Sequence, residues 1–343
     1  MQHTIKYFYW ISAIFLATGC GTKPIGAGRQ AKVAQQVWVV TGASSGLGRG
    51  ISLQAAAYKA RVVLVSRNRE ELETIAGELQ SSGAETMVVP TDIGDSSAVK
   101  DLVDRVVREW GRVDVWVNNA GVTVLGDFTK VPLREHARVV DVNLKGTMYG
   151  SYFAIQQFQR QGYGKLVNIA SAESRLPTAY QASYAATKGA LINLGKVIRQ
   201  ELRLSKQSGI RVVSVDPWAL NTPIWDNAAN YSGHAPRMSP MDRTGKAVNA
   251  VMRAGSGNRN RDLKVGWKTH SAYAVHWLFP RISTRIASNI VHRHQMELSP
   301  PAEDTSGNLF TPSKNNEVET DVRKRMKEEK KIYKKRKKQA AKK

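Results

Sequence analysis

A glycine-rich turn near the start of the chain most constrains the fold that this sequence can adopt. Residues 41–48 read Thr-Gly-Ala-Ser-Ser-Gly-Leu-Gly, between the apolar run 37–40 and a helical-looking stretch at 49–58. Glycines let a backbone turn tightly and approach a pyrophosphate, and the following helix offers free N–H groups and a positive dipole end. A strand, a glycine turn and a helix in this order therefore predict a cradle for a dinucleotide.

Apolar runs alternate with amphipathic stretches over most of the chain. The runs are rich in β-branched residues without strict alternation, which is typical of strands buried on both faces; they lie at 37–40, 62–65, 87–89, 113–117, 165–169 and 211–215. Helical patterns lie near 46–58, 69–82, 96–110, 133–160, 182–206 and 240–254. Right-handed crossovers then predict an α/β fold, a Rossmann-like doubly wound parallel sheet. We expect one main domain at 36–264, after a linker at 23–35.

The residues after this domain have a different character. The stretch 265–298 mixes aromatic and basic residues, and Pro280 is expected to break any helix there. Two helical pieces of this kind either lie in a membrane interface or pack on the main domain or a partner subunit. Residues 299–322 are rich in Pro, Ser and Asn, so we expect a loose linker.

The net charge of +23 is unevenly distributed. Residues 323–343 hold thirteen Lys and Arg against two Glu, a net of +11, and form a polybasic tail. Such a tail is either solvated and mobile or attracted to a polyanion. An anionic membrane surface contributes roughly 1 kcal/mol per basic residue. Nucleic acid is the less favoured partner because Tyr333 is the one aromatic residue of the tail.

The N-terminal segment is apolar. Sixteen uncharged residues at 7–22 would span roughly 24 Å as a helix, short of the hydrocarbon core. Residues 1–22 therefore read as an apolar leader, a short membrane anchor or, through Cys20, a loose match to a lipoprotein box. Basic residues cluster after the segment, which favours the cytoplasmic face of a membrane. Soluble cytoplasmic and lipoprotein locations stay as alternatives. The single cysteine excludes a disulfide framework and a cysteine-rich zinc site.

Three side chains downstream have the chemistry of an acid–base centre. Tyr184 and Lys188 are four residues apart, so they share one helix face. A nearby ammonium favours the phenolate and is expected to bring the phenol pKa closer to neutral. Ser171 follows an apolar strand and is expected to face the crevice at its carboxyl end. Each residue alone is an ordinary surface or loop residue; their combination with the glycine turn carries the hypothesis.

The spacing Thr41, Gly42, Gly46 and Gly48, with Tyr184-x-x-x-Lys188, resembles the shorter branch of the short-chain dehydrogenase/reductase family over roughly 36–255. The resemblance implies hydride transfer between a nicotinamide and a carbonyl or secondary alcohol. It implies four catalytic positions: Tyr184 as acid/base, Ser171 on the substrate oxygen, Lys188 on the tyrosine and the nicotinamide ribose, and Asn143 in a proton relay. It also implies cofactor contacts from the glycine turn, from Tyr184 and Lys188, and from three other segments. The residues are Thr41, Gly42, Ser44, Ser45, Gly46, Leu47, Gly48, Asp92, Asn118, Ala120, Gly121, Tyr184, Lys188, Pro217 and Thr222.

The end of the second predicted strand bears on the choice of dinucleotide. An acidic residue there would bind the ribose 2′-hydroxyl of NAD and repel the 2′-phosphate of NADP. The run 61–65 ends instead in Ser66 and Arg67. Because a guanidinium offers forked donors to phosphate, we expect NADP(H), held by Arg67 with help from Ser66.

One departure from the family pattern concerns the substrate side. The family usually has Pro-Gly after the sixth strand, whereas this chain has Pro217 followed by Trp218. We expect Trp218 either to narrow the pocket or to stack on a substrate, and residues 225–240 to form a substrate lid. Leu176, Trp218 and Trp225 hint at an apolar small-molecule substrate. A homo-oligomer through the long helices is also expected. The alternative function is a non-catalytic dinucleotide-binding sensor or membrane scaffold.

Overall fold

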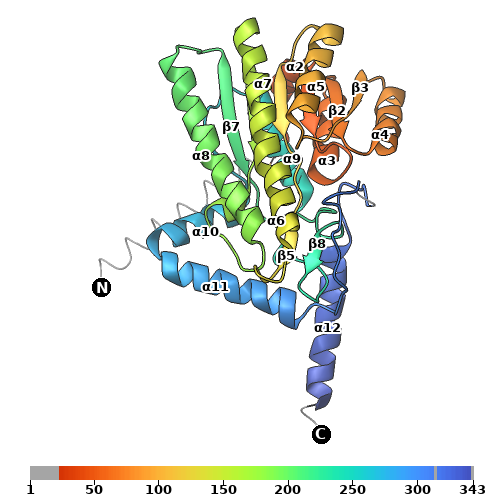
Figure 1. Cartoon of the computed structure of the whole chain (residues 1–343), viewed down its shortest axis with the longest axis vertical. Coiled ribbons are helices and arrows are strands. Elements are labelled where there is room, and N and C mark those ends of the chain that lie inside the picture. Colours follow the sequence, from red (N-terminus) through yellow and green to blue (C-terminus); the bar gives the residue numbers. More distant parts are fainter. Residues whose placement is uncertain (1–22, 313–314, 341–343) are drawn as a thin grey trace.

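The computed structural model describes residues 23–312 and 315–340, so the expectations for residues 1–22 lie outside the described part. Its centre is a parallel seven-stranded sheet in the order β3-β2-β1-β4-β6-β7-β9 (Figure 1). The strands run in the expected places: β1 (Val37–Thr41), β2 (Arg61–Ser66), β3 (Thr86–Pro90), β4 (Val115–Asn118), β6 (Gly164–Ile169), β7 (Ile210–Asp216) and the short β9 (Leu263–Lys264). The predicted α/β fold with a Rossmann-like doubly wound sheet is confirmed.

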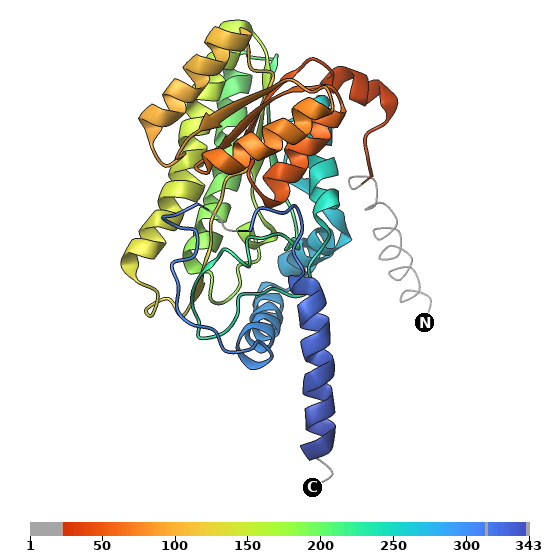
Figure 2. The ribbon, with the colours of Figure 1, turned by 90° about the vertical axis from the view of Figure 1, so that its right-hand side faces the viewer.

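Helices cover both faces of the sheet (Figures 1 and 2). One core contains side chains of α3 (Gly46–Ala57), α4 (Arg69–Ser81) and α9 (Thr244–Ser256) against alternate strand residues such as Val40 and Leu64. The opposite core contains those of α5 (Ser96–Trp110), α7 (Gly146–Gln161) and α8 (Ala182–Leu204) against Val39 and Val63. Both faces of β1 are therefore buried, which explains its continuous apolar run.

The remaining described elements are short or terminal. They are α2 (Ala27–Val33), the strands β5 (Val124–Gly126) and β8 (Ala229–Tyr231), α6 (Leu133–Val140), the π-turn η2 (Asp141–Lys145), the 3₁₀ turn η3 (Ala172–Ser174), α10 (Gly266–Leu278), α11 (Pro280–His292), the π-turn η4 (Arg293–Glu297) and α12 (Val322–Ala340). The expected helix over 133–160 is one run of helical backbone, but η2 interrupts it at Asn143. Pro280 lies in the first turn of α11, where a proline ring is tolerated, and separates that helix from α10.

The C-terminal residues differ most from expectation. The segment 299–322 is not a loose linker, because its backbone is hydrogen-bonded to the main domain at several points. Thr305 and Asn230 exchange two backbone hydrogen bonds of 2.8 and 2.9 Å, and Thr320 N–H donates to the Asn221 carbonyl. Most of the polybasic tail, up to residue 340, lies in α12, which extends away from the body of the molecule (Figure 2). Among the helices described, none is both long and apolar enough to cross a membrane.

Candidate active site

The glycine turn lies where the strand order reverses. From β1 the chain builds β2 and β3 on one side and then returns to place β4 on the other, and ligands bind at such a switch point. Gly42 and Gly46 have φ angles of +67° and +55°, which favour glycine. A Cβ atom on Gly48 would lie 2.0 Å from the Gly42 carbonyl oxygen. Because these three glycines lack side chains, the backbone can turn tightly next to the start of α3.

A cavity of about 580 Å³ begins at this turn and continues to the first turns of α8 (Ala182–Leu204). Residues expected to contact a cofactor or substrate line it from several elements: Gly42, Ser44, Ser45, Gly46, Leu47, Ser66, Arg67, Asp92, Ala120, Gly121, Ser171, Tyr184, Lys188, Pro217 and Thr222. The volume suits a dinucleotide with a small substrate. The glycine turn, the α3 N-terminus and the guanidinium at the far end fit the parts of such a cofactor.

Four of the expected site residues do not line the cavity; two of them hold the loops that do. The Thr41 hydroxyl accepts hydrogen bonds of 3.0 Å from both Asn119 N–H and Ala120 N–H. Asn118, at the end of the middle strand β4, donates to the side chains of Asn168 on β6 and Ser151 on α7. Gly48 and Asn143 are the other two. The expected direct contacts of Thr41, Gly48 and Asn118 with a cofactor stay a prediction; in the structure Thr41 positions the 119–120 loop.

Asn143 fixes the cofactor-side loop from behind. Its side-chain amide makes two hydrogen bonds with the backbone of Val122, at 2.8 and 2.9 Å, and a third with the Thr187 hydroxyl on α8. The π-turn η2 turns this side chain inward. A Cβ atom on Gly121 would lie 3.4 Å from Asn143 Oδ1 and 3.6 Å from Lys188 Nζ. Asn143 therefore lies beside the lysine and joins η2, the 121–122 loop and α8.

The three chemical side chains meet at one point of the cavity. Ser171 follows β6, and Tyr184 and Lys188 lie on the first turns of α8. The Tyr184 phenol and the Ser171 hydroxyl share a hydrogen bond. Lys188 Nζ donates to the Ile169 carbonyl at 2.8 Å and lies 5.6 Å from the centre of the Tyr184 ring. The spatial convergence expected from the sequence is present.

Burial changes the protonation of this group. Desolvation, followed by the nearby Glu173 carboxylate, raises the pKa of Tyr184, while the Ser171 hydrogen bond opposes this. Burial lowers the pKa of Lys188 to about 8. The sequence predicted a phenol pKa lowered by Lys188 together with the positive nicotinamide of an oxidised cofactor. For the protein's own groups the pKa is raised instead, because desolvation and Glu173 favour the neutral phenol. At neutral pH the phenol is therefore protonated, and Lys188 beside it is mostly an ammonium.

Sequence reasoning missed three buried groups around this centre. Glu173 accepts hydrogen bonds from Thr178 and Gln181, and burial raises its carboxyl pKa to about 7. Asp216 ends β7, and burial likewise raises its pKa to about 7. The Tyr273 hydroxyl, from α10, bonds the Ser171 carbonyl at 3.1 Å and Asp216 at 3.3 Å. No local pattern marks Tyr273, since about a hundred residues separate it from Ser171.

Because Glu173 is buried, removing its charge is expected to stabilise the protein, by an amount that depends on pH. Its folded pKa of about 7 lies above the reference value of 4.5, so the stability it supports at low pH is lost as pH rises through 7. Glu173→Gln keeps an acceptor for Thr178 and removes the buried charge. We expect the free energy of unfolding at pH 8 to rise by up to about 3 kcal/mol, with a smaller change at pH 5. Denaturant titration at both pH values measures it, with exposed Glu109→Gln as control; an equal effect at both pH values would contradict it.

The far end of the cavity is rich in guanidinium groups. Arg67 follows β2, and Arg138 on α6 approaches it closely enough to lower its pKa, after burial as the larger cause. Arg138 pairs with the Asp92 carboxylate. Arg67 donates to three backbone carbonyls of the C-terminal segment, those of Asn308, Leu309 and Thr311, at 2.6, 2.9 and 3.0 Å. Two cations thus face one carboxylate here.

Comparison with known proteins agrees with this arrangement. The family model for short chain dehydrogenases matches residues 36–231, which is more than half of the chain. The chain belongs to the short-chain dehydrogenase family. It is an oxidoreductase of that family, whose members bind a nicotinamide dinucleotide. The expected family resemblance is confirmed.

Individual relatives of this short-chain dehydrogenase cover most of the chain. It is 30% identical over 279 residues to an uncharacterized oxidoreductase, YxnA, of Bacillus subtilis, across 80% of this chain and 78% of that protein. A short-chain dehydrogenase structure from Streptomyces avermitilis has a TM-score of 0.63 and 27% identity, over 74% of this chain and 96% of that one. The Thermococcus sibiricus alcohol dehydrogenase, solved with 5-hydroxy-NADP, has a TM-score of 0.58 and 25% identity, over 68% and 96%.

Proposed function

We propose that this protein is an NADP(H)-dependent oxidoreductase that transfers hydride between nicotinamide and a carbonyl or secondary alcohol, with Tyr184 as the acid/base. The observation that carries the proposal is the meeting of Tyr184, Ser171 and Lys188 in the cavity that begins at the glycine turn. The runner-up is a dinucleotide-binding sensor or scaffold without turnover. The complete set of chemical side chains argues against it, because a binding protein has no need of a buried acid–base pair.

The side chains have separable roles in this reaction. When bound, the dinucleotide supplies or accepts the hydride. Tyr184 gives its proton to the substrate oxygen during reduction and takes one during oxidation. The Ser171 hydroxyl donates to the same oxygen and stabilises its developing charge. Lys188 keeps an ammonium beside the phenol and, at pH 7, is mostly protonated because its pKa is about 8. Asn143 holds the 121–122 loop against α8, the helix that carries Lys188.

The preference for NADP(H) rests on the far end of the cavity. Arg67 and Arg138 together carry one more charge than Asp92 neutralises, so an anion at this place is favoured. Ser66 lines the same place, and its hydroxyl accepts from Asn68 N–H. The NADP analogue in the Thermococcus sibiricus protein supports this assignment by likeness only.

The substrate end of the cavity supports an apolar substrate. Leu176, Trp218, Ile224, Trp225 and Met238 line it. The Trp218 indole donates to the Pro240 carbonyl at 2.6 Å and so joins the residue after Pro217 to the expected lid at 225–240. The direct test is NADPH consumption by the purified protein over a panel of aldehydes and ketones of increasing hydrophobicity. Absence of turnover over the whole panel would favour the sensor function.

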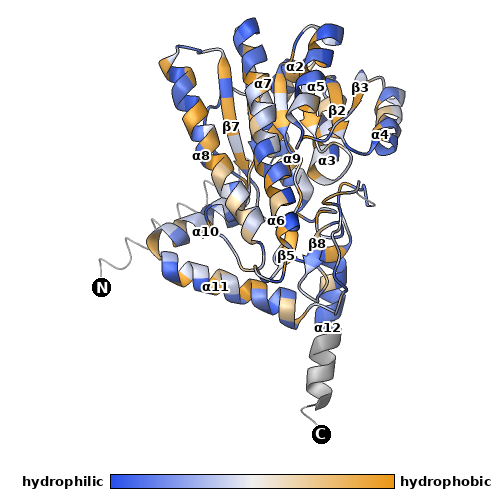
Figure 3. Ribbon diagram, viewed as in Figure 1, coloured by the Kyte–Doolittle hydropathy of each residue, from blue (hydrophilic) through white to orange (hydrophobic). Residues whose placement is uncertain are grey.

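We further propose that an anionic membrane surface is the partner of α10 and α11. The turn between α10 and α11 exposes large apolar side chains. We call Trp277, which is 82% exposed, and Phe279, which is 55% exposed, the ridge. The hydropathy of Figure 3 shows apolar and polar residues alternating along α11. Ile286 and Ile290 are exposed and also line the cavity, so the cavity opens onto this ridge. The basic α12 lies at the same end of the molecule (Figure 1).

Removing the ridge tests this partner. We expect Trp277→Ser with Phe279→Ser to weaken binding to vesicles of phosphatidylcholine and phosphatidylserine at least tenfold, because each buried large apolar side chain contributes roughly 1.5–3 kcal/mol. Cosedimentation measures it, with Phe128→Ser and Tyr152→Ser as exposed aromatic controls. Equal binding by both double variants would contradict a role for the ridge. Homo-oligomer formation through α7 and α8 stays a prediction that light scattering measures.

A further inference from the structure

The C-terminal segment lies across the cofactor end of the cavity. We define the strap as residues 305–312 and 315–320, which precede α12. Leu309 is fully buried in the core that contains α5 and α7, and Asn308 N–H donates to the Asn227 carbonyl at 2.9 Å. Asn308 and Pro312 line the cavity. The strap is therefore a wall of the site, although it lies outside the region that the family model matches.

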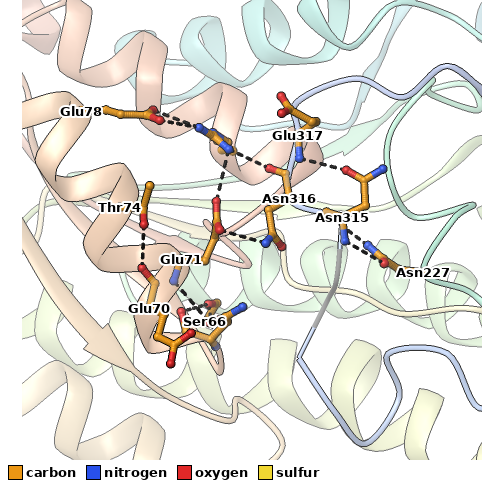
Figure 4. A network of polar contacts seen from close by, with 11 residues as sticks. Ser66, Glu70, Glu71, Thr74, Glu78, Asn227, Asn315, Asn316 and Glu317 are labelled. Carbon is orange, nitrogen blue, oxygen red and sulfur yellow. Dashed lines mark hydrogen bonds and ion pairs between the residues drawn. The ribbon is translucent and has the colours of Figure 1, made fainter.

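The second half of the strap is fixed to the start of α3 and to α4 (Figure 4). The Gly46 N–H donates to the Glu317 carbonyl at 2.8 Å. The Arg49 guanidinium donates to the Asn316 carbonyl at 3.0 Å and pairs with Glu71, whose other oxygen accepts from the Asn316 amide. Asn227 donates to the Asn315 carbonyl at 2.9 Å. These contacts hold the strap at the pyrophosphate side, which NAD and NADP share.

The first half of the strap is hydrogen-bonded to Arg67, the residue expected to distinguish NADP from NAD. Arg67 Nη2 donates to the carbonyls of Asn308 and Thr311, and Nη1 donates to that of Leu309. A forked contact with phosphate uses Nη2 together with either Nε or Nη1. Because both Nη2 hydrogens are taken by carbonyls, no forked contact is open while the strap is in this position.

We propose that the strap and the 2′-phosphate of NADP(H) compete for Arg67, so that NADP(H) binding displaces residues 305–312 whereas NAD(H) binding leaves them in place. The inference rests on the proposed function and adds a segment that sets cofactor preference. A phosphate dianion is a stronger acceptor for a guanidinium than a neutral carbonyl, which gives the exchange its direction. NAD(H) lacks the phosphate, and the cavity beneath the strap is large enough for it.

This competition has a calculable consequence for affinity. The binding-competent state for NADP(H) is the one with the strap released, so the apparent Kd exceeds the intrinsic one by the reciprocal of that state's population. Weakening the strap therefore tightens NADP(H) binding and leaves NAD(H) binding unchanged. The Gly46–Glu317 contact affects both dinucleotides alike and contributes no preference.

Leu309→Ala is the variant that loosens the competing half, since it removes the buried side chain between two of the carbonyls. We expect the Kd for NADPH, from the fluorescence of the reduced nicotinamide, to fall at least fivefold, and the Kd for NADH to change less than twofold. Leu79→Ala on α4 is the matched control, because it removes another buried leucine away from the strap. It should leave the ratio of the two constants unchanged.

Hydrogen exchange of the unmutated full chain supplies a second measurement. Saturating NADPH should raise exchange in peptides spanning 305–312, and saturating NADH should not. Adenosine 2′,5′-bisphosphate should reproduce the effect of NADPH, and AMP should not.

Protection of these peptides by NADPH, or weaker NADPH binding by Leu309→Ala, would overturn the proposal and make the strap a clamp on the cofactor. If NADPH is preferred through Arg67 without any change in exchange, the strap proposal fails and the proposed function stands. If NADPH is not preferred over NADH in any form of the protein, both fail.

Discussion

Replacing Tyr184 with Phe is expected to lower kcat for carbonyl reduction by about 10²–10⁴-fold, the usual contribution of a positioned general acid. The ring remains against Lys188, and only the hydroxyl that bonds Ser171 is lost. The Kd for NADPH should change little, since the phenol donates to the substrate oxygen. Steady-state kinetics and a fluorescence titration measure the two quantities.

A control for this variant is Tyr152→Phe, which removes a phenol from an exposed position on α7. It should retain full activity. Turnover by Tyr184→Phe within threefold of the unmutated protein would remove Tyr184 from the mechanism and leave Glu173 as the nearest alternative acid, because its pKa of about 7 also supplies a proton near neutral pH.

The second large effect is expected from Arg67→Asp. The substitution removes the guanidinium and places a carboxylate where the 2′-phosphate is expected. A hydrogen bond to a charged group contributes about 1.5–3 kcal/mol, so NADPH binding should weaken by about 100-fold or more. NADH binding should weaken less than threefold, because the carboxylate accepts from a ribose hydroxyl. Paired titrations with both dinucleotides give the ratio.

Arg69→Asp provides the matched control for this charge reversal. Arg69 lies two residues further along, on the first turn of α4, and its side chain is 65% exposed in a pair with Glu73. It should leave the ratio of the two constants unchanged. An equal loss of both dinucleotides in Arg67→Asp would show that the phosphate site lies elsewhere, with Arg138 as the next candidate.

The positions of the main site residues could be predicted from the sequence because each depends on the residues next to it in the chain. The glycine turn needs only positive φ angles at Gly42 and Gly46, and Tyr184 and Lys188 need only one turn of helix to share a face. Ser171 needs only the end of a parallel strand. In each case the signal and the structure depend on residues within a few positions of each other, so a single sequence contains them.

The partners of these residues could not be predicted, because they come from distant parts of the chain. Tyr273 meets Ser171 and Asp216 only when α10 packs beneath β7. The raised pKa of Glu173 depends on burial that no local pattern specifies. The composition of 299–322, rich in residues typical of loops, predicted loose chain, whereas a buried Leu309 and a series of backbone hydrogen bonds fix it.

The sequence by itself determined the alternation of strands and helices, the dinucleotide cradle and the identity of the chemical side chains, because periodicity and backbone freedom are local properties. Only the tertiary structure decided how those side chains are protonated, which of them face the cavity and what Arg67 contacts. Desolvation and long-range packing set these properties, and both depend on residues that the fold brings together from opposite ends of the chain.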